Sequence, residues 1–96
     1  ESLNRTVGEE LREKESEALS AAGEWAEAES SRAAQCGWNV GEKVAAEVML
    51  SQIKTAVGRN DAAAAKALLC GYRYFLLYSG APSEAAEGAK ICFEAL

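Results

Sequence analysis

The sequence predicts an all-α protein, an up-down antiparallel bundle of about four helices. Its composition favours helix over sheet, because one proline and many alanines accompany few β-branched residues. Capping and breaking signals divide the 96 residues into four segments separated by turns of a few residues. Helices joined by such short turns pack as antiparallel neighbours. The length suits a single helical-bundle domain over residues 1–96.

The first helix is expected over residues 6–35. Thr6 with Glu9 has the T-x-x-E spacing of a capping box. Gly37 can end the helix after Cys36 by adopting left-handed backbone. Gly23 is expected to bend this helix or to split it in two.

The apolar seam of this first helix is narrow, with gaps at Lys14 and Glu29. It consists of Leu3, Val7, Leu11, Ala18, Ala22, Trp25 and Ala33. Since the seam is narrow and its flanks are mostly charged, we expect the first helix, which is the longest, to be the least buried of the four.

The second helix is expected over residues 40–57. Asn39 with Glu42 repeats the capping-box spacing, and Gly58 stops the helix. The expected apolar arc comprises Ala45, Val48, Met49, Ile53, Ala56 and Val57.

The third and fourth helices are expected over residues 61–79 and 83–96. Asn60 or Asp61 caps the third helix, and Ser83 caps the fourth after the turn at Gly80. The fourth helix is expected to place Ala85, Ala89, Cys92, Phe93 and Leu96 on one face, opposite Glu87, Lys90 and Glu94.

The third helix is apolar on two sides. At about 100° per residue, one arc holds large side chains suited to the core: Leu68, Leu69, Tyr72, Phe75 and Leu76. The opposite arc holds Ala63, Ala67, Gly71, Tyr74 and Tyr78. Tyrosine is enriched at protein interfaces. Two interpretations stay open: the first helix covers this second arc, or a partner protein or a second copy of the chain does.

Arg73 lies on a strip between the two arcs, in heptad steps with Arg59 and Lys66. It either reaches water, pairs with a carboxylate of the acidic first helix, or recognises an acidic partner. The candidate interface is therefore Ala67, Gly71, Arg73, Tyr74 and Tyr78.

The three cysteines leave two alternatives open. Cys70 and Cys92 each lie eleven residues from Ala81, so an antiparallel hairpin places them at the same height, as a disulfide requires. The alternative is that both are free thiols that pack as small hydrophobic groups. Cys36 falls at a turn and is expected to be exposed.

The net charge of −5 is unevenly placed. Residues 1–33 carry nine acids and four bases, whereas residues 34–96 carry six of each. We expect no nucleic acid partner, because phosphate binding needs a concentrated basic surface. We also expect no membrane span, since no apolar stretch of about 18 uncharged residues occurs. The chain begins at Glu1 without methionine, which suggests a processed chain or a fragment and is compatible with a secreted or organellar protein.

No catalytic, metal or cofactor motif is present. The sequence has no histidine, so neither a Ser-His nor a Cys-His pair can form. No E-x-x-H, CxxC, P-loop or dinucleotide signature occurs. We therefore expect no enzyme activity, no metal and no cofactor.

Three functional hypotheses remain, and the first is a non-catalytic protein-protein interaction module, a small accessory or structural subunit of a larger assembly. The second is a secreted or organellar regulator, an effector or chaperone-like adaptor, that acts through the acidic first helix. The third is a carrier of a small apolar ligand, with Trp25, Phe75 and Phe93 lining its pocket.

Overall fold

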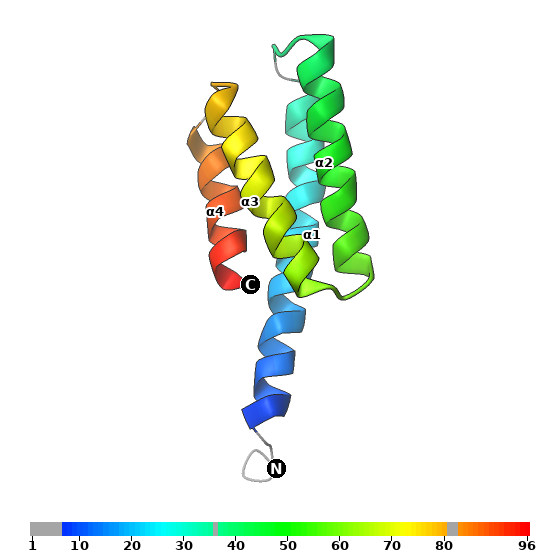
Figure 1. Cartoon of the computed structure of the whole chain (residues 1–96), viewed down its shortest axis with the longest axis vertical. Coiled ribbons are helices and arrows are strands. Elements are labelled where there is room, and N and C mark those ends of the chain that lie inside the picture. Colours follow the sequence, from blue (N-terminus) through cyan, green and yellow to red (C-terminus); the bar gives the residue numbers. More distant parts are fainter. Residues whose placement is uncertain (1–6, 36, 81–82) are drawn as a thin grey trace.

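The chain folds into four α-helices that pack as an antiparallel bundle. The computed structural model describes residues 7–35, 37–80 and 83–96, with side chains from residue 10 onward. The helices are α1 (Val7–Gln35), α2 (Val40–Gly58), α3 (Ala62–Tyr78) and α4 (Ser83–Ala95) (Figure 1). The predicted all-α bundle of four helices is confirmed, with each helix within one residue of its expected bounds over the described residues.

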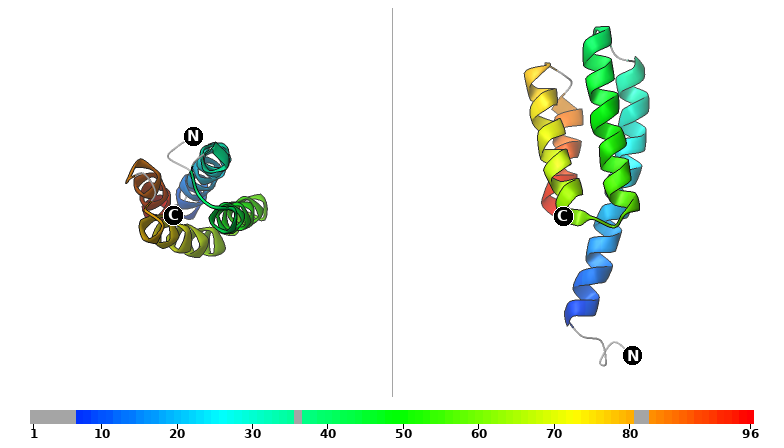
Figure 2. Two further views of the ribbon diagram at one scale, coloured as in Figure 1. Left: turned by 90° about the horizontal axis from the view of Figure 1, so that it is seen from above. Right: turned by 45° about the vertical axis from the view of Figure 1, so that its right-hand side comes forward.

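The helices follow one another around the bundle. α1 packs most extensively on α2, and α3 on α4, while α2 and α3 join the two pairs. α1 and α3 lie across the diagonal and meet at few places, which the view down the bundle shows (Figure 2). Each helix therefore keeps one outer side that no other helix of the chain covers.

The predicted caps of α2 and α3 are confirmed. Asn39 and Glu42 form the capping box: the backbone N–H of Glu42 donates to Asn39 Oδ1 at 2.8 Å, and that of Asn39 donates to Glu42 Oε1 at 3.3 Å. Asp61 Oδ1 accepts from the backbone N–H of Ala64 at 3.1 Å. α4 begins at Ser83 itself, so Ser83 is its first residue instead of a preceding cap. The predicted roles of Thr6 and Cys36 fall outside the described residues.

The turn between α2 and α3 uses both residues that the sequence offered as caps, for different tasks. Asn60 has a φ of 59°, in the left-handed region that asparagine tolerates better than most residues. The backbone N–H of Asn60 donates to Val57 O, and that of Asp61 to Ala56 O, each at 2.9 Å. This is the Schellman pattern that satisfies the last carbonyls of a helix. Asn60 therefore ends α2, and Asp61 starts α3.

Gly23 does not split the first helix: α1 runs unbroken from Val7 to Gln35. A Cβ built on Gly23 would lie 3.2 Å from Cγ1 of Val57. The glycine thus lets α2 approach α1 closely near the end of α2. Since α2 ends one residue later, at Gly58, the first part of α1, before Leu19, extends beyond its neighbour (Figure 1).

This extension explains one error in the predicted seam of α1. At about 1.5 Å per residue, 29 residues of α1 outreach 19 residues of α2 by roughly 15 Å. Residues 10–17 are all exposed, and Leu11, placed in the seam by its spacing, is 61% exposed. We call residues 10–17 the α1 arm. The structure shows no helix of the described chain packed around it (Figure 1).

The core lies between the four helices and is rich in alanine. Its buried residues form one main cluster and one smaller cluster near the α2–α3 turn, the latter built from Leu19, Ala56 and Ala65. The main cluster contains Ala22, Ala26, Ala33, Ala46, Leu50, Ile53, Leu69, Tyr72, Leu76, Ala85, Ala86 and Ala89. Small side chains at facing positions let the helices approach closely.

The predicted arc of α2 is partly wrong. Ala46 and Leu50 are fully buried, whereas Val48, which the sequence placed in the arc, is 51% exposed. The reason is that apolar residues lie nearly all around α2, so their spacing alone does not single out the inward side. The predicted faces of α4 and the inner arc of α3 agree with the observed burial.

Candidate interaction surface

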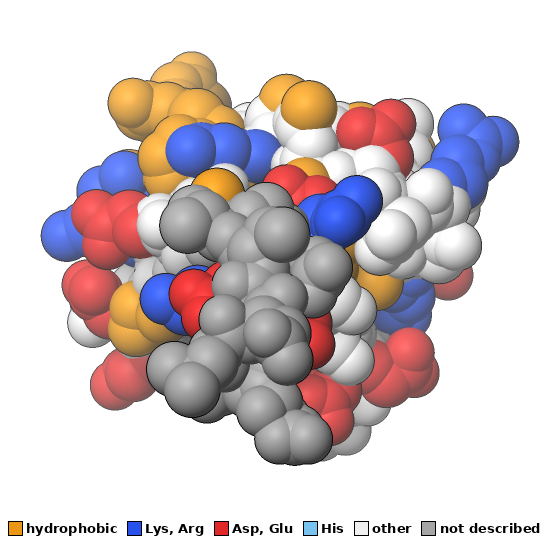
Figure 3. All heavy atoms as spheres, turned by 90° about the horizontal axis from the view of Figure 1, so that it is seen from below, with side chains coloured by type: hydrophobic (Ala, Val, Ile, Leu, Met, Phe, Trp, Pro, Cys, Tyr) orange, Lys and Arg blue, Asp and Glu red, His pale blue; other side chains and the backbone are white. Residues whose placement is uncertain are grey.

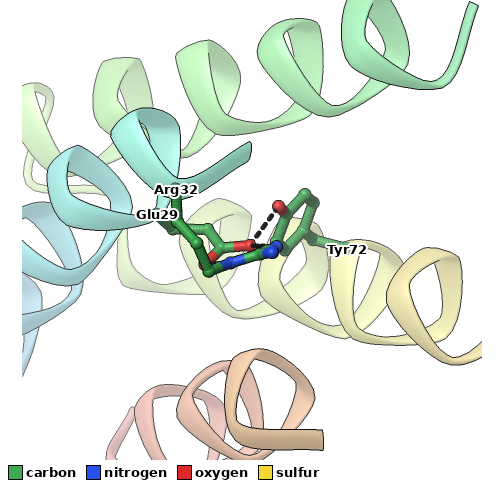
Figure 4. A network of polar contacts seen from close by, with 3 residues as sticks. All are labelled: Glu29, Arg32 and Tyr72. Carbon is green, nitrogen blue, oxygen red and sulfur yellow. Dashed lines mark hydrogen bonds and ion pairs between the residues drawn. The ribbon is translucent and has the colours of Figure 1, made fainter. Parts of the chain in front are cut away.

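A buried polar network fixes how α3 is turned in the bundle. The hydroxyl of Tyr72, on α3, donates to Glu29 Oε2 on α1 at 2.6 Å (Figure 4). Arg32, one turn along α1, donates from Nε to Glu29 Oε1 at 2.8 Å and from Nη2 to Glu29 Oε2 at 2.5 Å. Tyr72 is fully buried, and Glu29 is only 4% exposed. Both carboxylate oxygens are therefore satisfied inside the fold, as a buried charge requires.

Aromatic rings surround this network. Trp25 meets Tyr72 edge to face, with ring centroids 5.7 Å apart, and Trp38 meets Phe75 in the same way at 5.5 Å. The guanidinium of Arg32 lies 5.5 Å from the centroid of the Trp38 ring. Edge-to-face pairs and a cation over a ring each add stabilisation beyond apolar burial. The network thus ties α1, the α1–α2 turn and α3 together.

The protonation equilibria of Tyr72 and Arg32 follow from this environment. Burial in an apolar surrounding, followed by the hydrogen bond to the negative Glu29, raises the pKa of the Tyr72 phenol well above its ordinary value of 10.0. The hydrogen bond to Glu29 raises the pKa of the Arg32 guanidinium further. At neutral pH the phenol is neutral and Arg32 is cationic, which is the state that the observed hydrogen bonds need.

Sequence reasoning treated Glu29 as a gap in the seam of α1 and gave Arg32 no role. The structure corrects this, because the gap is a buried carboxylate. Two signals were present: Glu29 continues the step from Ala22 and Ala26 to Ala33, and Arg32 stands three residues later, at ion-pair spacing. What the sequence lacked was the long-range partner, Tyr72, 43 residues away.

Because the network holds Tyr72 inward, the opposite side of α3 faces away from the bundle. All the exposed residues of α3 lie on this side, and none of them is charged. We call them the α3 strip: Ala63, Ala67, Gly71, Tyr74, Leu77 and Tyr78. The side chain of Tyr78 is 95% exposed, that of Tyr74 63% and that of Leu77 55%. α1 therefore does not cover the second arc of α3, and the first of the two interpretations is wrong.

The packing of the single chain does not explain why residue 71 is a glycine. A Cβ built on it meets nothing within 4 Å. Glycine in the middle of a helix costs about 0.5–1 kcal/mol relative to alanine. Gly88 of α4 offers the contrast, because a Cβ there would run into Nε1 of Trp25. The packing of the bundle thus accounts for Gly88 and leaves Gly71 unexplained.

Arg73 lies at the edge of the strip that faces α4, next to Leu77. It is half-buried and lines a hollow of about 170 Å³ with residues from the end of α3 and from α4, among them Leu77 and Glu87. Its neighbour in the heptad series, Lys66, lies 5.0 Å from the ring centroid of Phe93 on α4. Both cations thus lie at the α4 edge. Of the predicted interface, the structure brings together Ala67, Gly71, Tyr74 and Tyr78 and leaves Arg73 to one side.

On its other edge the α3 strip adjoins a part of α2 whose exposed side chains are mostly uncharged. Two grooves, of about 340 and 330 Å³, share Ser51 and Gln52 and run from the outer side of α2 into the space between α2 and α3. The first groove contains Val44 and Val48 beside Glu47, and the second, which also contains Arg59 and Asp61, reaches Ala64 of α3. Three exposed valines follow this side of α2 at four-residue steps, Val40, Val44 and Val48. We call them the valine strip.

Residues seven apart lie on nearly the same side of a helix. This spacing shows that the α3 strip and the valine strip lie on the sides of their helices that border the groove between α2 and α3. Ala64 lines the groove, and Gly71 and Tyr78 stand seven and fourteen residues after it. On α2, Thr55 lines the groove, and Val48 stands seven residues before it. The α3 strip and the valine strip therefore belong to one outward side of the molecule, which we call the neutral face.

Charge is concentrated on the other helices. Exposed acids follow α1 and α4, with two bases on the α1 arm, while the exposed residues of α2 include a single charged side chain, Glu47. Seen from the end where α1 projects, charged side chains surround most of the outline (Figure 3). Hydrophobic side chains gather at the upper left of that view, on the side where α3 lies. The neutral face is the part of the surface most suited to contact with another protein.

The cysteines correspond to the second of the alternatives that the sequence left open. Cys70 and Cys92 are free and half-buried in the structure. Cys92 packs against the main core cluster, and burial raises the pKa of its thiol. A thiol with a raised pKa is a poor nucleophile at neutral pH. Cys36 lies outside the described residues.

The side chains considered for a ligand pocket are half-buried and pack against the core. Trp25, Phe75 and Phe93 contact the main cluster, and the largest hollow described along α1 and α2, about 370 Å³, is lined instead mainly by polar and small residues, including Lys43, Glu47 and Lys54. Within the described part of the chain, no three histidine, cysteine or acidic side chains come together as metal ligands would. Over the same residues, no helix is long and apolar enough to cross a membrane.

Comparison with known proteins adds no assignment. Neither a protein-family model, nor a curated protein, nor a solved structure matches this chain. The arguments about function therefore depend on the surface described above.

Proposed function

We propose that this chain is a non-catalytic protein-protein interaction module, a small accessory or structural subunit that binds its partner through the α3 strip. The observation that carries the proposal is an exposed helix side with no charge along its full length. Apolar side chains scattered singly over a surface need no explanation, whereas a contiguous row is typical of a contact site. Tyr74, Leu77 and Tyr78 form such a row over the last two turns of α3.

The composition of the row supports a protein partner. Tyrosine combines a large apolar ring with a polar tip and loses little conformational freedom on binding, so it is common among residues that dominate binding energy. The small residues Ala67 and Gly71 precede both exposed tyrosines on the same side of α3, and a partner's backbone could pass closely over them. A solvated helix of this length would ordinarily carry charged residues on its outer side.

The α1 arm supports a second candidate function, that of a regulator that binds through its acidic first helix. Every residue from 10 to 17 is exposed, and four of these eight residues are glutamates. The arm also carries Arg12 and Lys14, and alternating charges of both signs are typical of a solvated helix. We therefore rank the arm below the α3 strip.

Site-specific photocrosslinking tests the proposal. A benzophenone amino acid is placed at Tyr74, where an aromatic side chain is already exposed, and the protein is irradiated in its native cells. The control places the same group at Ile91 of α4, which is 59% exposed against 63% for Tyr74. A third version places it at Leu11, in the α1 arm, which is 61% exposed.

We expect discrete covalent adducts with protein, of the same chain or of another, from position 74 and not from position 91. Adducts from position 11 alone would support the second candidate. Equal, diffuse labelling from all three positions would contradict both.

A further inference from the structure

We propose that the occupant of the α3 strip is a second copy of this chain, bound through an antiparallel pair of α3 helices about a two-fold axis near Gly71. This inference rests on the proposed function, since it names the partner of the same surface. The observation behind it is that the α3 strip is complementary to itself. A surface that binds a different protein does not need this property.

The self-complementarity is visible in the order of residue sizes. The first half of the strip is small, with Ala63 and Ala67, and the second half is large, with Tyr74 and Tyr78. When two copies of α3 run antiparallel about an axis between residues 70 and 71, residue i faces residue 141 − i of the partner. Ala67 then faces the partner's Tyr74, and Ala63 faces the partner's Tyr78. In an isologous interface each such contact occurs twice.

Gly71 lies at the centre of this arrangement. Residues 70 and 71 of one copy face residues 71 and 70 of the other, so the two helices come closest where one position has no side chain. Glycine in a helix interior lets another backbone approach closely. The packing of the single chain does not supply this reason, because a Cβ at Gly71 meets open space. The dimer does.

Charge favours the same arrangement. Two copies share a net charge of −5 each, so contact through α1 or α4 would bring acids together. The α3 strip contains no charged residue, and the flanking Lys66 and Arg73 are half-buried at the α4 edge. The α1 arm projects at the end of the bundle where α3 begins (Figure 1). An antiparallel pair therefore sends the two arms to opposite ends, farther apart than a Debye length of about 8–10 Å.

The available area fits a dimer of modest affinity. Two tyrosines, each of about 150–250 Å² and exposed to 63% and 95%, contribute roughly 240–400 Å². A standard interface takes about 800 Å² from each partner, so the tyrosines supply a third to a half of it. Leu77, the small residues of the strip and the adjoining valine strip supply further apolar area. We expect association in the micromolar range, not a permanent dimer.

Sedimentation equilibrium of the purified chain from about 1 to about 200 µM, a range that covers such affinities, measures the association directly. We expect the average mass to rise with concentration from 10.2 kDa towards twice that value. A single species of 10.2 kDa over the whole range would overturn the dimer. In that case the photocrosslinking at Tyr74 still decides the proposed function, because adducts with a different protein would support it.

The Gly71→Ala variant separates an interface role from a structural one. In the single chain this change adds a methyl group in open space and improves helix propensity, so the urea midpoint of the monomer should rise. In the dimer the methyl group separates the helices, and we expect the dissociation constant to increase at least tenfold. A variant that is more stable and equally dimeric would show that Gly71 does not lie at the axis.

A charge-pair experiment tests the register. Ala67→Glu and Tyr74→Arg each place a charge in the strip, and each variant alone should be monomeric. In a mixed dimer of the two variants, the new Glu at position 67 of one chain faces the new Arg at position 74 of the other. The second contact between positions 67 and 74 keeps its native Ala and Tyr, so the mixed dimer should form. The matched control mixes Ala67→Glu with Tyr78→Arg, because position 78 faces position 63 and not 67.

Circular dichroism should confirm that all three variants fold, since positions 67, 74 and 78 are exposed in the single chain. Mixed dimers in the first mixture and none in the control support the antiparallel register. Equal association in both mixtures, or unchanged dimerisation of the single variants, places the contact elsewhere and overturns the proposal.

Discussion

Tyr72 donates a hydrogen bond of 2.6 Å to Glu29 across the diagonal of the bundle, where α1 and α3 otherwise meet at few places. This contact lies on the same side of α3 as the buried Leu69 and Leu76, and with them it turns that side inward. It buries the phenol and a carboxylate together. The opposite, uncharged side of the helix stays exposed and forms the candidate interface.

Breaking this contact from either end should destabilise the fold to different degrees. We expect Tyr72→Phe to lower the free energy of unfolding by about 1.5–3 kcal/mol, since a hydrogen bond to a charged acceptor is lost while Arg32 still neutralises Glu29. Glu29→Ala should cost about 3–5 kcal/mol, because it leaves the buried hydroxyl and the guanidinium without their acceptor. Urea unfolding followed by circular dichroism measures both.

The double variant shows whether the two side chains act together. If they are coupled, Tyr72→Phe in the Glu29→Ala background should cost clearly less than in the native background. Additive losses would contradict a direct interaction between the two groups.

The raised pKa of Tyr72 predicts a loss of stability at alkaline pH. The pKa of Tyr72 is higher in the folded state than in the unfolded state, where it is 10.0. The protonated phenol therefore stabilises the fold fully below pH 10, and this contribution decreases as the pH rises above 10. Between pH 9 and pH 11 this decline amounts to about 1.4 kcal/mol for one phenol. Tyr72→Phe should remove that part of the decline, whereas Tyr74→Phe, at an exposed position, serves as the control.

Absorbance at alkaline pH offers an independent check. Ionisation of the Tyr72 phenol should accompany unfolding, not precede it. Reversible ionisation of the Tyr72 phenol while the circular dichroism stays native would contradict the burial of Tyr72.

The two helix-interior glycines Gly71 and Gly88 should respond to alanine in opposite ways. Gly71→Ala places its methyl group in open space and should stabilise the monomer by about 0.5–1 kcal/mol. Gly88→Ala drives a methyl group into the indole of Trp25 and should destabilise it by about 1–3 kcal/mol. Thermal unfolding at low protein concentration, where association does not contribute, compares the pair. Equal shifts would mean that Trp25 does not pack on α4 as described.

How far the sequence predicted these results depends on the distance over which each signal acts. The capping box at Asn39 and the Asp61 cap are local, and both were predictable from spacings of three residues. The inward side of α2 was not, because apolar residues surround that helix and only its neighbours decide between Leu50 and Val48. The two-sided character of α3 was readable from the sequence, but which helix covers which side was not.

The free state of Cys70 and Cys92 predicts a simple mass experiment. Protein purified without reductant, then denatured and treated with a maleimide, should be modified at both positions. In the native protein Cys92 should react slowly, because burial shields its thiol and raises its pKa. A native mass two daltons below that of the reduced chain, with neither cysteine reacting with the maleimide, would instead show a disulfide between Cys70 and Cys92. Their equal distance in sequence from Ala81 is compatible with such a bond.

The α1 arm should contribute little to the stability of the bundle. Removal of residues 1–14 takes away side chains that, from residue 10 on, are all exposed, so the urea midpoint should stay within the change expected of surface substitutions, about 0.5 kcal/mol. Removal of residues 1–20 also deletes Leu19, which is 2% exposed and packs with Ala56 and Ala65. We expect that second truncation to cost about 2–5 kcal/mol, as for loss of a buried leucine.

The shorter truncation also separates the two candidate functions. If the α3 strip is the contact surface, the chain without residues 1–14 keeps its association and its crosslinks from position 74, because the arm lies beyond the end of the bundle where α3 begins. If the acidic arm is the contact surface, the same truncation abolishes binding while the bundle stays folded. The second result would overturn our assignment in favour of the regulator that acts through α1.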